Sequence, residues 1–165
     1  PEDIRRRMVE SGITREMQDA LAVESHNRAQ RATEAGYFKD QIVPVMLKSR
    51  KGEVAYAIDE HFRPNASLDD MAKLKPVFVK ENGTVTAGNA SGINDAAAAV
   101  VLMSGEQVKA RGAKPLARLV GYAHAGVDPK YMGIGPVPAT QAVLKKTGLK
   151  ISDIDVIEAN EAFAA

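Results

Sequence analysis

Three stretches of the sequence hold side chains whose types and spacing could do chemistry. Asn160 and Glu161 follow the apolar run 154–158, where a strand is expected to end and a helix to begin. The stretch 82–95 holds three glycines among residues with short side chains, so a ligand or another backbone could approach it closely. The third stretch, 132–138, is a stiff loop of glycine and proline. Taken singly, each has an ordinary interpretation: an Asn at a strand end is commonly a cap, and a glycine-rich stretch is commonly a flexible loop.

The composition argues against several other kinds of site. The chain has no cysteine, which excludes disulfides and thiolate metal sites, and His26, His61 and His124 lack the short spacing of a metal-ligand motif. The net charge of +1 gives no reason to expect nucleic acid or a charged membrane surface. No apolar run approaches the roughly 20 residues that span a bilayer, and the charged N-terminus is unlike a signal peptide. We therefore expect a cytoplasmic protein that binds no metal, nucleic acid or membrane.

The first half of the chain predicts helices and one hairpin. A short charged helix is expected at 2–10, and a longer one from the N-cap Thr14 to the glycine stop at Gly36. Residues 42–47 and 54–58 alternate in the manner of a β-hairpin, with Pro44 placing the first strand at an edge or a bulge. The irregular stretch 59–82 allows a short helix near 68–74, and an irregular stretch of this length is usually functional.

The second half predicts an α/β pattern. Apolar, strand-like runs are expected at 96–103, 116–125 and 154–158. They alternate with a helix that begins at a capping box at Ser104 and a helix at 138–146, which Gly148 closes. Ligand sites in such folds favour the carboxyl ends of strands. A further helix is expected to begin at 160–165, and because both ends of the chain look cut, we expect a piece of a longer protein rather than a processed or tagged small domain.

The three stretches, in this order and at these separations, resemble signature blocks of the thiolase family, whose members make and break 3-oxoacyl-CoA. The blocks are NEAFAA at 160–165, GTVTAGNASG at 83–92 followed by Ile93, Asn94 and Asp95, and MGIGPVPA at 132–139. The intervening sequence is similar to bacterial β-ketothiolases throughout. The resemblance implies a layered α/β/α/β/α sandwich of two core domains with a loop domain that holds coenzyme A. Residues 1–112 would be the later part of the N-terminal domain (1–93 loop domain, 96–112 core strand and helix), and 115–165 the first part of the C-terminal domain.

The resemblance also implies a mechanism that this chain holds only in part. Thiolases condense acyl-CoA with acetyl-CoA, or thiolyse 3-oxoacyl-CoA, through an acyl-cysteine intermediate, and they use two cysteines, a histidine and oxyanion holes. Both cysteines are absent here, and the family's Gly-His-Pro histidine would lie beyond residue 165. Asn160 matches the family's Asn that holds an oxyanion-hole water. We therefore expect an acyltransferase segment that is inactive alone, with coenzyme A as substrate, no cofactor, and a dimer or tetramer as the full-length assembly.

The resemblance assigns CoA contacts residue by residue. Ser91 matches the Ser that hydrogen-bonds the pantetheine arm, with Ala87 and Ala90 packed against it. Phe78 and Arg63 match residues near the adenine and the nucleotide, and Met132 and Phe163 match apolar walls, with Ala162 in the same substrate-binding set. For Phe78, Met132 and Phe163, plain core packing remains an equal interpretation. Asp70 stands where relatives often carry a small Ser, and an acidic residue there could weaken or reshape the contact.

Two alternatives remain open. The chain could be a stand-alone CoA-binding or interaction module without chemistry. A small hydrolase using Asn160, Glu161 or Asp155 with His124 is a third reading, but no spacing supports it. The three histidines fall outside the matching blocks, so the family resemblance assigns them no role.

Overall fold

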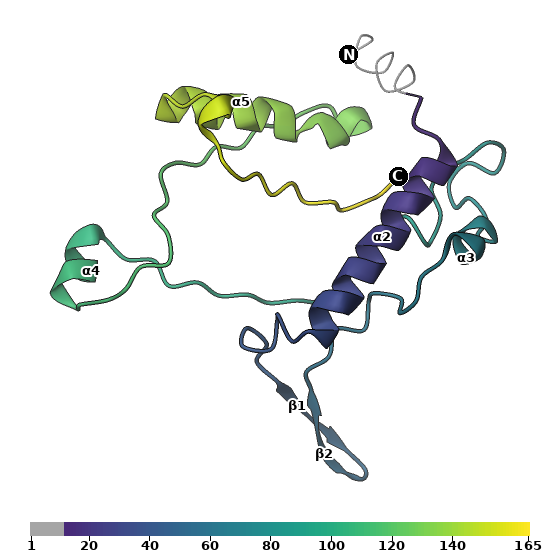
Figure 1. Cartoon of the computed structure of the whole chain (residues 1–165), viewed down its shortest axis with the longest axis horizontal. Coiled ribbons are helices and arrows are strands. Elements are labelled where there is room, and N and C mark those ends of the chain that lie inside the picture. Colours follow the sequence, from purple (N-terminus) through teal and green to yellow (C-terminus); the bar gives the residue numbers. More distant parts are fainter. Residues whose placement is uncertain (1–11) are drawn as a thin grey trace. The chain divides into compact units, whose positions relative to one another are not determined.

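Residues 12–165 are described by the computed structural model, in which they form two compact units (Figure 1). One unit contains residues 12–95 together with Asn160–Ala165, and the other contains Ala96–Ala159. The helix predicted at 2–10 lies outside the described residues. No helix within 12–165 has both the length and the apolar character needed to cross a membrane. The predicted domain division at 112–115 stays a prediction.

The longest element is the helix α2, Arg15–Glu34, and its ends follow from the sequence as predicted. Thr14 is the N-cap, and its hydroxyl oxygen accepts a hydrogen bond from the Met17 N–H at 3.3 Å. Just after the helix, Gly36 takes a left-handed φ of 76°, which a residue without Cβ adopts readily. The predicted helix from Thr14 to Gly36 is confirmed.

The face that α2 buries is more polar than its sequence pattern predicts. Helical spacing predicts a narrow face of mostly small residues, made of Met17, Ala20, Leu21, Ser25, Ala29 and Ala32. Met17 and Leu21 on this face are nevertheless 56% and 41% exposed. The buried positions are instead Gln18, Asp19 and Ala22. Asp19 can be buried because its carboxylate accepts hydrogen bonds from Arg15 and from Asn89 of the loop that packs on the helix. Gln18 Oε1, by contrast, is buried without a hydrogen-bond partner in the described chain.

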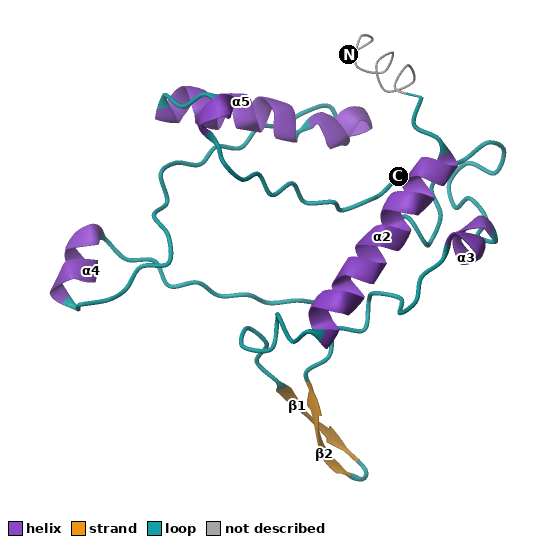
Figure 2. Ribbon diagram, in the orientation of Figure 1, coloured by secondary structure: helices purple, strands orange, loops and turns teal. Residues whose placement is uncertain are grey.

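A hairpin and a short helix complete the secondary structure of this unit (Figure 2). Strands β1 (Val45–Ser49) and β2 (Gly52–Tyr56) pair antiparallel, with Val45 opposite Tyr56, so the predicted hairpin is confirmed. Pro44 has no N–H to donate to a ladder and directly precedes β1. The helix α3, Leu68–Ala72, is capped by Ser67 and packs on α2.

The unit formed by Ala96–Ala159 contains short helices joined by irregular chain. These are α4 (Gly105–Ala110), the 3₁₀ segment η1 (Pro129–Ile134), α5 (Pro136–Thr147) and the 3₁₀ turn η2 (Ile151–Asp153). The Ser104 hydroxyl caps α4 by accepting from the Gln107 N–H, and Gly148 ends α5 with a φ of 73°. Both predicted helices are therefore present.

The strands predicted in this unit are wrong for this structure. Residues 96–103, 116–125 and 154–158 form no strand, and most of their large apolar side chains are well exposed, for example Val101 at 85% and Val156 at 84%. A strand is held by hydrogen bonds to neighbouring strands, and these three runs do not pair with one another in the described chain. The helix predicted to begin at 160–165 is also not formed, because so short a run carries the full cost of helix nucleation.

Candidate functional site

The glycine-rich segment 83–92 is anchored on α2 through the buried side chain of Asn89, which is 2% exposed. Its Nδ2 donates to Asp19 Oδ1 (2.9 Å) and to the Thr84 carbonyl oxygen (2.8 Å), and its Oδ1 accepts from the Thr86 N–H (2.7 Å). Both polar ends of the amide are thus satisfied, as burial requires. One side chain therefore fixes the shape of the segment and its place on the helix.

Asp19 extends this anchor to a second segment. Its Oδ2 accepts from Arg15 Nε at 2.7 Å, while its Oδ1 is engaged by Asn89. The Arg15 guanidinium also donates to the carbonyl oxygens of Met71 (2.8 Å) and Leu74 (3.2 Å), at the end of α3. A short polar network on the first turns of α2 therefore holds both the glycine-rich segment and the chain around α3.

The segment Asn160–Ala165 joins the same unit through a backbone contact. The Ala164 N–H donates to the Asn89 carbonyl oxygen at 2.9 Å. This hydrogen bond brings the Asn160 block beside the glycine-rich block, although the two are far apart in the sequence. Two of the three stretches singled out from the sequence therefore meet in one place.

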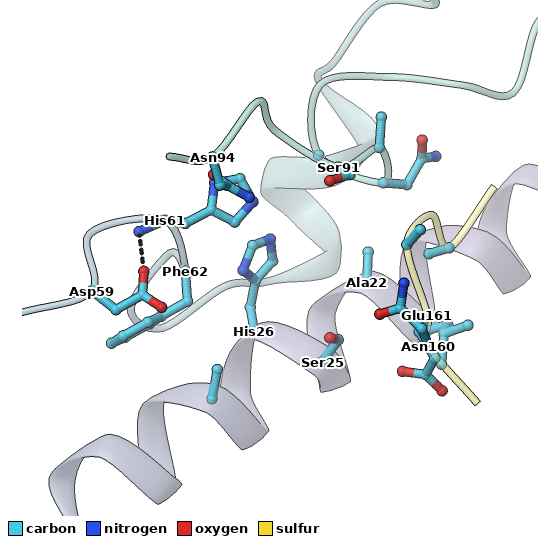
Figure 3. Close-up of a pocket in the computed structure, with 17 residues that line it drawn as sticks. Ala22, Ser25, His26, Asp59, His61, Phe62, Ser91, Asn94, Asn160 and Glu161 are labelled. Atoms are coloured by element: carbon cyan, nitrogen blue, oxygen red, sulfur yellow. Dashed lines mark hydrogen bonds between the residues drawn. The ribbon is translucent and has the colours of Figure 1, made fainter. Parts of the chain in front are cut away.

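An open pocket of about 340 Å³ lies where these segments meet (Figure 3). Its floor comes from α2, with Ala22 and His26, and its walls include Ser91 and Asn160. In Figure 3, His26 projects from α2 between His61 and Ser91. The remaining lining residues are Leu21, Ser25, Ala29, Asp59, Phe62, Gly88, Asn89, Ala90, Asn94, Glu161, Ala162 and Ala164.

A second open pocket, also of about 340 Å³, adjoins the first. The residues that line both are His26, His61, Gly88 and Ala90. Arg63, Ala87 and Asp70 line the second pocket only. The two pockets together form a path that passes the histidines and the glycine-rich segment, with Asn160 on one pocket and Arg63 on the other.

The polar groups of this path suit binding rather than covalent chemistry. The Ser91 hydroxyl donates to the neighbouring Gly92 carbonyl oxygen at 2.9 Å, not to a base that would activate it as a nucleophile. Its oxygen can still accept a hydrogen bond from a ligand. Asn160 offers a neutral amide that both donates and accepts. Within residues 12–165, no three acidic or histidine side chains come close enough together to hold a metal ion.

Two ionisable side chains on the path, His26 and Asp70, have pKa values shifted from their ordinary values. Burial, followed by the nearby charges of His61 and Arg63, lowers the pKa of His26 below its ordinary value of 6.5, although a hydrogen bond with the Gly88 backbone opposes this. The hydrogen bond from Lys73, followed by that from Ser67, lowers the pKa of the exposed Asp70 carboxyl. Lys73 Nζ lies 2.8 Å from Asp70 Oδ1, so the two side chains form an ion pair.

The structure brings together six of the nine residues assigned to the substrate from the sequence. Three of them, Asn160, Ser91 and Ala162, line the first pocket. Ala90 lines both pockets, while Ala87 and Arg63 line the second. Their individual roles stay predictions.

The other three assigned residues line neither pocket. Phe78 is 76% exposed, and Phe163 is 45% exposed beside two alanines that do line the first pocket. Met132 is 73% exposed and belongs to η1 in the other compact unit. None of the three is packed as a core residue, so the interpretation of plain core packing also finds no support in this chain.

Sequence reasoning missed His26 and His61, which line both pockets. Helical spacing carried a signal for His26, because Ala22, His26 and Ala29 follow the i, i+4, i+7 pattern of one helix face and all three line the first pocket. No comparable signal existed for His61. It lies in an irregular segment whose path depends on contacts with α2.

The chain matches two family descriptions that together span most of its length. Residues 5–106 match the N-terminal domain of thiolase, and residues 113–165 match the thiolase C-terminal domain. The chain is 68% identical over 156 residues to the beta-ketothiolase BktB of Cupriavidus necator, covering 94% of this chain and 40% of that protein. It is 56% identical over 153 residues to the acetyl-CoA acetyltransferase of Shinella zoogloeoides, covering 93% and 39%.

Solved structures agree with these matches. The crystal structure of the Bacillus anthracis acetyl-CoA acetyltransferase superposes with a TM-score of 0.88 at 52% identity, covering 96% of this chain and 40% of that one. Human mitochondrial 3-ketoacyl-CoA thiolase gives a TM-score of 0.80 at 47% identity, covering 94% and 39%. The matches and the superpositions therefore define the class of the chain as part of a thiolase fold. The chain belongs to the thiolase family, and it spans about 40% of the length of the relatives it matches. The predicted resemblance and the predicted fold, part of a thiolase sandwich, are confirmed.

Proposed function

We propose that this chain forms the CoA-holding part of a thiolase, an acyl-CoA C-acyltransferase. The whole protein to which it belongs, called the parent protein below, would condense acyl-CoA with acetyl-CoA or thiolyse 3-oxoacyl-CoA. The observation that carries the proposal is the position of Ser91 and Asn160. They come from two separate family blocks and line one pocket. The names of the relatives, which include an acetyl-CoA acetyltransferase and a 3-ketoacyl-CoA thiolase, support the same class of reaction.

The path of two pockets suits a long, flexible substrate with a charged end. The first pocket offers hydrogen-bonding groups and small side chains, which suit the amide-containing pantetheine arm and the thioester. The second carries Arg63, whose guanidinium can pair with phosphate or stack on a base. Asp70 on this pocket would repel phosphate, but its ion pair with Lys73 offsets part of its charge. We therefore assign the thioester end to Asn160 and the nucleotide end to Arg63.

Asn160 would act on the thioester through its amide dipole. A neutral amide can hold a water, or donate directly, toward the oxygen on which negative charge develops during acyl transfer. The acyl group itself must go to a nucleophile that this chain does not carry, because it has no cysteine. The chain would thus position the substrate, and the parent protein would supply the cysteines and the histidine. It would act as a dimer or tetramer, as the family resemblance implies.

The test is the variant Ser91→Ala in the parent protein, with steady-state kinetics over a range of CoA concentrations. Loss of one hydrogen bond to the pantetheine arm should raise the KM for CoA about 2- to 10-fold while kcat changes little. The control is Ser152→Ala, which removes an exposed hydroxyl in η2, outside both pockets. An unchanged KM in Ser91→Ala would remove the assignment of this pocket to CoA.

A further inference from the structure

Three side chains on one face of α2 hold the backbone that carries Arg63. His26 Nδ1 accepts from the Arg63 N–H at 3.1 Å, and Gln30 Oε1 accepts from the Asn65 N–H at 2.8 Å. Asn27 Nδ2 donates to the Ala66 carbonyl oxygen at 3.3 Å. Residues 63–66 have no regular secondary structure, so these contacts stand in for the hydrogen bonds of a helix or sheet.

His26 differs from the other two because it can change its protonation state near neutral pH. To accept from the Arg63 N–H, Nδ1 must be unprotonated, which fixes the neutral ring with its proton on Nε2. A proton taken up from solvent would add a donor at Nδ1 directly facing the Arg63 N–H. The acceptor would be lost and two donors would oppose each other. Asn27 and Gln30 do not titrate, so their contacts with Ala66 and Asn65 remain. Only the contact with Arg63 is lost.

The surroundings of His26 favour the neutral form of its ring. Burial is the largest cause of its lowered pKa, followed by the charges of His61 and Arg63. The His61 ring lies 6.4 Å away between centroids, tilted by 43°. Asp59 and Glu161 also line the pocket that His26 faces, so charges of both signs are present. His26 lines both pockets, but the segment that its ring holds carries Arg63, which lines the second pocket only.

We propose that His26 is a positioning residue for the nucleotide end of the CoA substrate: its neutral ring holds the Arg63 segment on α2, and protonation releases it. This inference rests on the proposed function, because it takes Arg63 as the nucleotide contact. CoA should therefore bind less tightly as the pH falls through the titration of His26. Pantetheine, which lacks the nucleotide, should bind with no such dependence.

The experiment measures CoA and pantetheine affinity of the parent protein by calorimetric titration between about pH 5 and 8, where histidine titrates. Wild type should lose roughly 3- to 10-fold in CoA affinity toward the acid end, the effect of losing about one hydrogen bond and its alignment of Arg63. His26→Asn keeps an acceptor near the position of Nδ1 but cannot titrate, so its pH profile should be flatter. Because the phosphates of CoA also titrate near pH 6, the difference between wild type and His26→Asn is the quantity that counts.

Two control variants separate positioning from a general structural effect. Gln30→Ala removes a neutral contact to the same segment and should weaken CoA binding by a similar factor at every pH. His61→Asn removes the neighbouring imidazole and should leave the pH dependence in place. Equal pH profiles in wild type and His26→Asn would overturn the proposal, as would loss of the dependence in His61→Asn. Absence of CoA binding at every pH would instead overturn the proposed function.

A second measurement needs neither a variant nor a ligand. The Arg63 amide should be protected from hydrogen exchange at neutral pH and should lose that protection at acid pH, after correction for the intrinsic exchange rate. The Asn65 amide, bonded to Gln30, should keep more of its protection and serves as the internal reference. Parallel behaviour of the two amides would overturn the role given to His26, even if every variant failed to fold.

Discussion

At the scale of single residues, the buried contact between Asp19 and Asn89 decides where Ser91 lies. The two carboxylate oxygens of Asp19 accept hydrogen bonds from different donors, Arg15 Nε and Asn89 Nδ2, so both oxygens are engaged. The Asn89 side chain also hydrogen-bonds the backbone of the glycine-rich segment, at Thr84 and Thr86. Asn89 itself lies only two residues before Ser91. The hydroxyl that we propose as a CoA contact is thus placed by a carboxylate that does not line either pocket.

The variant Asp19→Asn tests this contact. An amide has one acceptor oxygen, so its NH₂ group must face one of the two donors, and a buried donor is left without a partner. We expect the free energy of unfolding of the parent protein to fall by about 1–3 kcal/mol, measured by urea denaturation. Asp40→Asn, an exposed change of the same charge, should stay within about 0.5 kcal/mol of wild type. Equal losses in the two variants would show that charge, rather than the buried contact, is responsible.

Single residues also show how far sequence reasoning reaches. Ser91 and Asn160 were identified from family blocks, and the structure brings them to one pocket. His26 and Asp19 were not, because their importance lies in contacts with segments distant in the sequence. The periodicity of α2 predicted a narrow inner face of small residues, whereas the structure buries Gln18 and Asp19 together with Ala22. Which polar side chain finds a buried partner is decided by the tertiary fold.

At the scale of elements, local signals predicted those elements that local interactions can hold. The cap at Thr14 and the glycine stops at Gly36 and Gly148 mark the ends of helices, and all three behave as predicted. The hairpin formed because its two strands are neighbours in the sequence. The runs 96–103, 116–125 and 154–158 failed as strands because a strand needs partners. We infer that their partners lie in parts of the parent protein that are absent from this chain.

The glycine-rich segment yields a prediction about close packing. A Cβ at Gly83 would meet the backbone carbonyl of Val79, while a Cβ at Gly88 would meet the flexible side chains of Met71 and Leu74. Backbone cannot move aside as a methionine can, so Gly83→Ala should destabilise the parent protein more than Gly88→Ala. We expect a cost of about 1–3 kcal/mol for Gly83→Ala by urea denaturation.

The control for this pair is Gly105→Ala at the start of α4, where an added Cβ meets nothing within 4 Å. It should be neutral or slightly stabilising, by up to about 1 kcal/mol, because alanine has less freedom to lose on folding. If Gly88→Ala proved the more costly of the two changes in the glycine-rich segment, the packing of Val79 against Gly83 would be less tight than the structure shows.

At the scale of the whole molecule, the chain buries very little apolar surface. The buried hydrophobic residues in the described part are Ala22 and Met71, while large side chains such as Leu116 and Ile93 are essentially fully exposed. Burial of apolar surface is the main favourable contribution to folding. The largest fully buried side chains in the described part are instead the polar Asn89 and Thr86. Such a chain depends on the remainder of the parent protein for a core.

The isolated chain should therefore show neither a cooperative thermal transition nor thiolase activity. Too little apolar area is buried to offset the loss of chain entropy, and the acyl acceptor cysteine is absent. Circular dichroism during heating and a thiolysis assay with a 3-oxoacyl-CoA test the two statements separately. A sharp transition of a monomer would contradict the first. Turnover above background without cysteine would contradict the mechanism proposed for the family site.

The hydrogen bond between Ala164 and Asn89 also has a consequence for the order of events during biosynthesis. The glycine-rich segment leaves the ribosome well before its partner at Ala164, because Ala96–Ala159 must be translated in between. At roughly 5–20 residues per second, this delay is on the order of several seconds. Throughout that interval Asn89 can already bond to Asp19, but the pocket lacks the wall that carries Asn160. The pocket is therefore completed only after Asn160–Ala165 has been made, and the proposed CoA site cannot form as a whole on a nascent chain before that point.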